Sequence, residues 1–279
     1  MKPLSSHQRF VYRLAIVIVF IAVIPVLVLY ANGFRPTREG FLKTGGLYIA
    51  TNRTGADIFI NNKLVKQSYF FKKGFFFENQ TPGTYSLVVS RPGYFSWYKD
   101  LSVKPEDVTE AYAFLVPEKP GLKSIERFTP AAQTSTGAPR GMVETPAYTA
   151  ATSLFADSSP VNSILKDNNI QLSVELKYIL AKWLGQAESA PAQFCEYVCT
   201  NSIDVFEADS DILNYSFLPG FDAVVLVSTK NQGVYLAEID GRDHHNIFPI
   251  YPVAGADFRI RADDTIIIKD GSLFFELGL

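Results

Sequence analysis

The hydrophobic pattern of this chain changes abruptly after residue 31. Residues 14–31, LAIVIVFIAVIPVLVLYA, form one run without a charged side chain, whereas the rest of the chain consists of short segments that alternate between apolar and polar residues. A helix rises about 1.5 Å per residue, so the run would span roughly 27 Å, close to the ~30 Å hydrocarbon core of a bilayer. The pattern predicts one transmembrane helix at 14–31, followed by a mainly β polypeptide.

The flanking charges do not decide the orientation of this helix by number, because three basic residues lie on each side of it. The free amino terminus and the lack of acidic residues before the run favour a cytoplasmic basic tail at 1–13. The main alternative is a cleaved signal peptide, whose apolar region is usually ~7–15 residues long and ends at small residues. The bulky Tyr30 at the end of this longer run favours an uncleaved anchor, with the bulk of the chain extracytoplasmic.

Residues 45–117 predict a small β-sandwich. Segments 47–51, 56–61, 84–90, 94–103 and 108–116 alternate as half-buried strands do. Thr54-Gly55, Asn61-Asn62 and two Pro-Gly steps separate them, and these residue types favour chain reversal. The insertion 67–80, rich in phenylalanine, is expected to add a hairpin.

The same residues resemble the PEGA domain. Arg53-Thr54-Gly55-Ala56 stands where that family has its Pro-Glu-Gly-Ala turn, so the glycine and alanine match and the proline and glutamate do not. Asn61-Asn62-Lys63 and Pro92-Gly93-Tyr94 match the later turns of the family. PEGA domains are displayed outside cells or in envelopes and have no established catalytic residues. The resemblance therefore implies an interaction module outside the cytoplasm.

The densest aromatic cluster of this domain is Tyr94, Phe95, Trp97 and Tyr98. One interpretation is a stacking surface for a glycan or a peptide. The other follows from the strand period of two, which places the even-numbered residues on one face and Phe95 and Trp97 on the other, with one face in the core. The alternation favours the core.

Residues 129–159 are dominated by Ala, Thr, Ser and Pro, and are expected to form a flexible linker. Strand patterns resume in a second β region, 161–279. Its segment 212–251 resembles a TolB- or WD40-like propeller blade, with Pro219-Gly220 and Ile239-Asp240-Gly241 at the turn positions. Propellers close with about four to eight blades, and this region supplies at most two or three. Three arrangements stay open: an open stack, copies of the chain that complete one another as a homo-oligomer, or a propeller that has lost blades.

Catalytic motifs are absent from the sequence: it contains no phosphate-binding loop, dinucleotide fingerprint, nucleophile elbow or metalloprotease helix. His244-His245, with Asp243 beside them, form the one small titratable cluster that an enzyme could use, and neighbouring Glu238 and Asp240 could crowd a cation there. Metal sites need three or four converging ligands, so a solvated turn is the preferred interpretation. We expect no catalytic, metal or cofactor residues.

The two cysteines, Cys195 and Cys199, could close a small disulfide loop outside the cytoplasm or stay free. A straight strand would hold their Cα atoms ~13 Å apart, so the disulfide requires a bent or helical segment. The disulfide is slightly favoured.

The near balance of 26 basic and 28 acidic residues gives no electrostatic support for nucleic-acid binding. We expect a single-pass membrane protein of the cell envelope whose non-catalytic β-domains interact with a protein or a cell-wall glycan. The alternative is an envelope hydrolase or lyase with its site in the propeller-like region.

Overall fold

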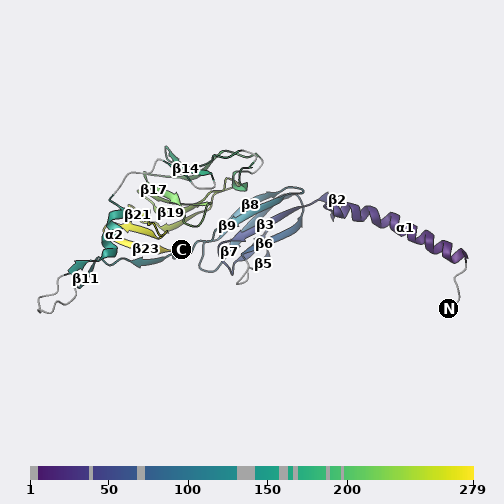
Figure 1. The fold of residues 1–279 in the computed structure, drawn as a ribbon, viewed down its shortest axis with the longest axis horizontal. Helices are drawn as coiled ribbons and strands as arrows, with labels where there is room; N and C mark the ends of the chain where they lie inside the picture. Colours follow the sequence, from purple (N-terminus) through teal and green to yellow (C-terminus); the bar gives the residue numbers. More distant parts are fainter. Residues whose placement is uncertain are drawn as a thin grey trace. The chain divides into compact units, whose positions relative to one another are not determined.

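The computed structural model describes residues 6–37, 40–67, 73–130, 142–156, 163–165, 169–186, 189–195 and 198–279. The fold is mainly β, with one N-terminal apolar helix and several antiparallel sheets, as predicted from the sequence (Figure 1).

The first element is the long helix α1 (Ser6–Ala31). It begins before the predicted residue 14, and Pro25 lies inside it without ending it. Residues His7–Ala31 are long and apolar enough to cross a membrane, and none of this segment is buried by the rest of the chain. The helix ends where the Asn32 N–H donates to Val28 O (3.0 Å) and Gly33 takes a φ of 80°, a conformation that glycine adopts without strain.

The chain divides into two compact units. The first contains Met1–Ala50, Gly74–Tyr85 and Leu101–Tyr112, and the second contains Thr51–Lys73, Ser86–Asp100 and Ala113–Leu279. The first unit holds α1 and a hairpin, β1 (Phe34–Thr37) and β2 (Gly40–Lys43). It also holds most of a three-stranded sheet of order β6-β3-β9, made of β3 (Gly45–Thr51), β6 (Gly74–Gln80) and β9 (Val108–Ala113).

A four-stranded antiparallel sheet of order β5-β4-β7-β8 supplies the remaining strands of 45–117. It comprises β4 (Asp57–Ile60), β5 (Lys63–Gln67), β7 (Gly83–Ser90) and β8 (Trp97–Val103). The five predicted strands are all present, but the extra hairpin expected in 67–80 is not: β5 pairs with β4, and β6 pairs with β3. Residues 68–72 lie outside the described part of the chain.

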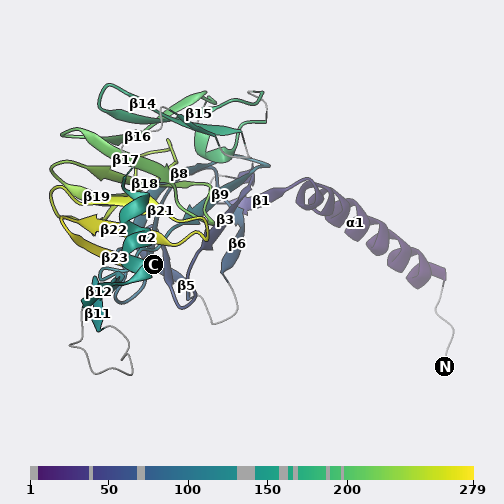
Figure 2. The ribbon, with the colours of Figure 1, turned by 60° about the vertical axis from the view of Figure 1, so that its left-hand side comes forward.

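Three further antiparallel sheets of four strands lie one above another in the second unit (Figure 2). The first stacked sheet has β13 (Ser163–Leu165), β14 (Ile170–Glu175), β15 (Tyr178–Trp183) and β16 (Ser202–Glu207). The second has β17 (Ile212–Phe217), β18 (Val224–Thr229), β19 (Gly233–Glu238) and β20 (Ile247–Tyr251). The third has β21 (Asp257–Ile260), β22 (Ile266–Asp270), β23 (Leu273–Gly278) and β10 (Gly121–Ser124).

Two hydrophobic cores join these sheets. Ile170, Leu172 and Val205 of the first sheet share a core with Val225 and Val227 of the second. The alternate residues of the second sheet, such as Leu226 and Leu236, share another core with Phe258 and Ile268 of the third. Every residue of β18 is buried because the middle sheet is covered on both faces, which explains its unbroken apolar run, VVLV.

The outer faces of the first and third stacked sheets differ in what lies on them. Helix α2 (Pro146–Leu154) covers the third sheet, where Tyr148 and Ala151 pack against Ile267 and Phe274. The first sheet instead alternates its core residues with polar ones on β14 and β16: Gln171, Ser173, Glu175, Ser202 and Asp204. A polar outer face is what a terminal layer needs. Among the described residues the strands of the second unit form stacked antiparallel sheets and no closed barrel, and the three arrangements considered for 161–279 stay predictions.

Two predicted boundaries need correction. Strand β10 completes the third sheet by pairing with β23, so the strand-rich region includes residues 121–124. The predicted linker 129–159 contains β12 (Met142–Glu144), paired with β11 (Phe128–Pro130), as well as α2. The linker prediction failed here because Tyr148 supplies a buried ring and Thr145 caps the helix by accepting from the Tyr148 N–H (3.1 Å). Residues 131–141 and 157–162 are outside the described residues.

Candidate functional site

A buried polar cluster connects strand β8 with the segment that follows β19. Its centre is Lys99, whose side chain is completely buried, and its other charged members are Glu238, Asp240 and Arg242. All four belong to the second unit. Buried ionised groups are costly unless they are paired and hydrogen-bonded, so the arrangement of their partners decides what the cluster can do.

The Lys99 ammonium lies between two carboxylates. It forms an ion pair with Glu238, lies 3.5 Å from Asp240 Oδ2, and donates to the Asp240 carbonyl at 3.3 Å. Asp240 in turn accepts from Arg242, through Nε at 2.9 Å and Nη2 at 2.7 Å. Two positive and two negative groups therefore compensate one another within the cluster.

Neutral donors complete the coordination of Glu238. The Trp97 indole N–H donates to Oε2 at 2.7 Å, and the Asn246 side-chain amide donates to Oε1 at 3.0 Å. A carboxylate with this many donors is held firmly in position. Each charged group of the cluster thus already has a partner within it. This is the arrangement of a structural contact between strands, and the two carboxylates are not arranged for acid–base chemistry.

The same segment covers the free edge of the sheet. Strand β8 is an edge strand, and its outward backbone groups would otherwise be open to pairing. The Asn246 amide accepts from the Tyr98 N–H (3.3 Å) and donates to the Tyr98 carbonyl (3.0 Å), and the Asp243 carboxylate accepts from the Asp100 N–H (3.0 Å). Side chains therefore take the place of a neighbouring strand.

The two histidines lie at the rim of this cluster. The His244 ring stacks on Tyr98 with 3.8 Å between centroids, and its Nδ1 lies 2.6 Å from Asp243 Oδ2. Burial acts to raise the pKa of Asp243, but the Asp100 N–H and His244 bond to its charged form, so this pKa lies below the usual value. His244 Nε2 and His245 Nδ1 are buried without a hydrogen-bond partner.

The surroundings of His245 favour its neutral form. Burial lowers the pKa of its imidazole, and the Lys99 ammonium lowers it further, while Glu238 and Asp240 act in the opposite direction. The net shift is downward. Protonation of His245 therefore opposes folding.

We expect acidification to weaken the fold through His245. Because the folded-state pKa is below the unfolded value of about 6.5, the unfolded chain takes up this proton first. The stabilisation is complete above that value and is lost as the pH falls below it, through the folded-state pKa. Urea unfolding of the wild type and of His245→Gln at pH values of about 7.5 and 5.5 should show a smaller pH effect in the variant. An identical pH effect in both proteins would contradict this assignment.

The four predicted interaction aromatics divide between two environments. Trp97 is buried against Glu238, and Phe95 stacks on Phe248 with centroids 5.7 Å apart. Tyr98 keeps about half of its surface exposed, but its ring is stacked on His244. Tyr94 lies under the guanidinium of Arg91, 4.7 Å from the ring centroid. Each of these four rings thus has a contact within the second unit, and a role as a stacking surface for a ligand stays a prediction.

In the described part of the chain, acidic side chains outside the Lys99 cluster do not converge on a cation either. Among the described residues, no group of three or more His, Cys, Asp or Glu side chains is placed to hold a metal ion. Asp209 and Asp211 line a 620 Å³ cleft beside the turn between β14 and β15. Asp263 is engaged by Arg261 through bonds of 2.8 and 2.7 Å.

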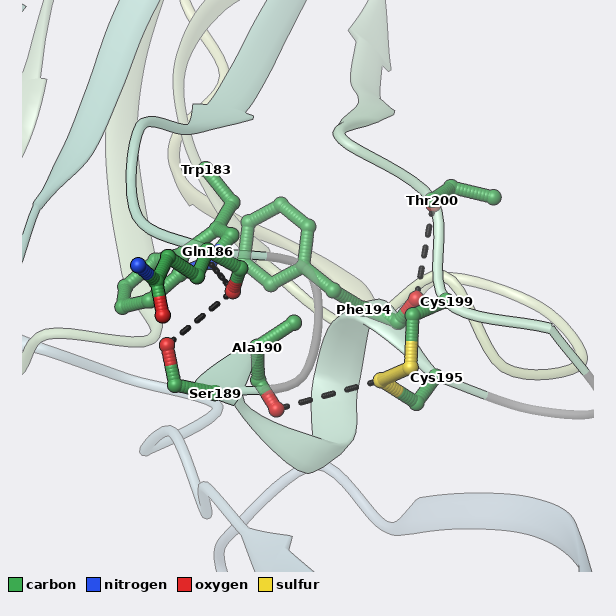
Figure 3. The surroundings of a disulfide bond; sticks show 8 residues. All are labelled: Trp183, Gln186, Ser189, Ala190, Phe194, Cys195, Cys199 and Thr200. Atoms are coloured by element: carbon green, nitrogen blue, oxygen red, sulfur yellow. Dashed lines mark hydrogen bonds between the residues drawn. A yellow bond between two sulfur atoms is a disulfide. The ribbon is translucent and has the colours of Figure 1, made fainter.

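Cys195 and Cys199 form a disulfide (Figure 3). Their Cα atoms are 4.0 Å apart, and Cys195 directly follows a short 3₁₀ turn, Ala192–Phe194. Phe194, immediately before the first cysteine, is buried in the core between the first and second stacked sheets. The disulfide therefore lies directly beside a residue that is fixed by core packing.

Sequence reasoning missed Lys99, Arg242 and Asn246. The available signal was the alternation Trp97, Lys99, Leu101, Val103, which places a lysine on the buried face of its strand. A lysine at such a position requires an acidic partner, but that partner lies 139 to 141 residues away and cannot be chosen from the pattern alone.

No protein-family model matches the chain, and no curated protein sequence matches it. The resemblances to PEGA domains and to propeller blades stay predictions that depend on the matching turns.

Proposed function

We propose that this protein is a single-pass membrane protein of the cell envelope. Helix α1 anchors it, and the β-domains lie outside the cytoplasm, where they interact with another protein or a cell-wall polymer. The observation that supports the membrane anchor is the surface of α1. Its apolar side chains between Phe10 and Tyr30 are exposed, and the segment has a mean hydropathy of 3.1. Exposed apolar surface on this scale is costly in water and favourable in lipid.

Two further observations support the proposed location and role. The Cys195–Cys199 disulfide fits an oxidising compartment, since the cytoplasm usually keeps thiols reduced. The charges around Lys99 are compensated and hydrogen-bonded, which suits a structural joint between sheets. Both favour stable β-domains displayed without catalysis.

One observation favours the second candidate function, an envelope hydrolase or lyase. His244 Nε2 and His245 Nδ1 lack hydrogen-bond partners, so two imidazole nitrogens are free to bond to a substrate, and His244 also contacts Asp243. A reactive centre also needs a substrate-sized recess beside these atoms. A display function does not need such a recess, so it requires less of this site, and we prefer the display function for that reason.

The proposed topology predicts a specific labelling pattern, because the chain has only two cysteines and they are bonded to each other. In intact spheroplasts, a membrane-impermeant maleimide should label the protein only after treatment with an impermeant reductant. The variant Cys195→Ser/Cys199→Ser should stay unlabelled and is the matched control. Labelling that requires opening the cells, or that occurs without reductant, would contradict an extracytoplasmic disulfide.

A further inference from the structure

The hairpin β1–β2 follows the anchor helix after only two residues, Asn32 and Gly33. It also returns to its starting point, because the Thr44 N–H and hydroxyl both lie 3.3 Å from Gly33 O. Four residues of strand extend about 13 Å. The described strand residues of the hairpin therefore lie within about 13 Å of Gly33, which is two residues beyond the end of α1.

The described side chains of this hairpin include an unusual amount of apolar surface for so short an element. Phe41 is 48% exposed and Leu42 is 37% exposed. Phe41 pairs with Pro36, and Leu42 pairs with Arg35. Phenylalanine and leucine beside arginine and lysine are the composition of segments that lie at the boundary between acyl chains and headgroups.

Polar contacts hold the hairpin against the rest of the first unit. Arg35 donates to Tyr30 O at 2.8 Å and to Asn79 Oδ1 at 2.7 Å, and its guanidinium lies 3.7 Å from the centroid of the Tyr30 ring. Lys43 forms an ion pair with Glu106 at 2.7 Å. The hairpin is thus tied to the last turn of α1, to β6 and to the turn before β9.

We propose that the β1–β2 hairpin is a second membrane-contact element. Phe41, on the hairpin face that it shares with Pro36, lies at the acyl–headgroup boundary of the leaflet from which α1 emerges, and the contacts of Arg35 and Lys43 transmit this position to the three-stranded sheet. The partner is the lipid bilayer itself. The argument is continuity: the headgroup layer is about 5–7 Å thick on each side of the hydrocarbon core, and the hairpin begins at its edge. This inference rests on the proposed insertion of α1.

Depth-dependent fluorescence quenching tests the proposal on the full chain in lipid nanodiscs. Three variants place a tryptophan at comparable exposed positions, and each is read as the difference from the parent protein, which contains Trp97 and Trp183. Phe41→Trp probes the hairpin, and Phe20→Trp probes the middle of α1. Phe76→Trp is the matched control, because Phe76 is 50% exposed and lies on β6 of the same unit.

The Phe41→Trp emission should shift to the blue on reconstitution and should be quenched more by headgroup nitroxides than by acyl-chain nitroxides. Phe20→Trp should show the reverse preference, and Phe76→Trp should show neither shift nor quenching. An unquenched Phe41→Trp beside a quenched Phe20→Trp would overturn the hairpin proposal and leave the anchor standing. A blue shift without nitroxide quenching would indicate a protein partner and would also overturn it. If Phe20→Trp itself escapes quenching, the proposed anchoring fails.

Discussion

Replacing Lys99 with methionine is expected to lower the free energy of unfolding by about 3–5 kcal/mol, the cost of leaving a buried charge without its partner. The substitution keeps most of the side-chain volume but removes the ammonium that lies between Glu238 and Asp240. Asp240 keeps Arg242, so Glu238 carries most of the loss. Urea unfolding in detergent, followed by tryptophan fluorescence, measures this difference.

The matched control is Lys43→Met. Lys43 also pairs with a glutamate, Glu106, but both side chains are substantially exposed, so a loss of about 0–1 kcal/mol is expected. The double variant Lys99→Met/Glu238→Gln should be more stable than Lys99→Met alone, because it removes the orphaned charge, and the glutamine oxygen can still accept one of the bonds that Trp97 and Asn246 donate to Glu238. A Lys99→Met protein as stable as the Lys43→Met protein would refute the structural role assigned to the cluster.

Two arginines in the middle of α1, Ile18→Arg and Val19→Arg together, are expected to release the protein from membranes. Each exchange costs about 3–4 kcal/mol of insertion free energy at the helix centre, or about 6–8 kcal/mol for the pair. Both residues are more than half exposed in the fold, so their loss does not disturb the packing of the β-domains. The fraction that stays in the pellet after alkaline carbonate extraction measures the effect.

The control for this experiment exchanges the same two residues, Ile18→Val and Val19→Ile, which preserves composition and length. It should stay in the pellet like the wild type. A chain with both arginines that still resists carbonate would show that α1 is not what holds the protein in the membrane.

The sequence predicts individual elements well where a single physical pattern decides them. The uncharged run at 14–31 needs no tertiary information to be read as a helix suited to lipid. The strands of 45–117 were identified because alternation and turn residues agree. Strand β18 lies within 212–251, the segment that resembles a propeller blade, and turn residues bound its apolar run on both sides.

The pattern fails where a segment depends on a distant partner. Strand β10 has four exposed residues, GLKS, and becomes a strand only by pairing with β23, some 150 residues later. Helix α2 lies in a stretch dominated by small and polar residues, so its composition resembles a linker. Two buried residues, Tyr148 and Ala151, are enough to fix it on the third sheet.

The sequence by itself determined the long apolar helix, the strand-rich character of the chain beyond that helix and the positions of most turns, because these depend on local periodicity and backbone preference. Only the tertiary structure decided that strands of the second unit form three stacked sheets of four strands. It alone placed Lys99 between Glu238 and Asp240 and brought the two cysteines into bonding distance. These outcomes depend on contacts between residues far apart in the chain, or on a backbone bend, and neither a strand period nor a charge count contains that information.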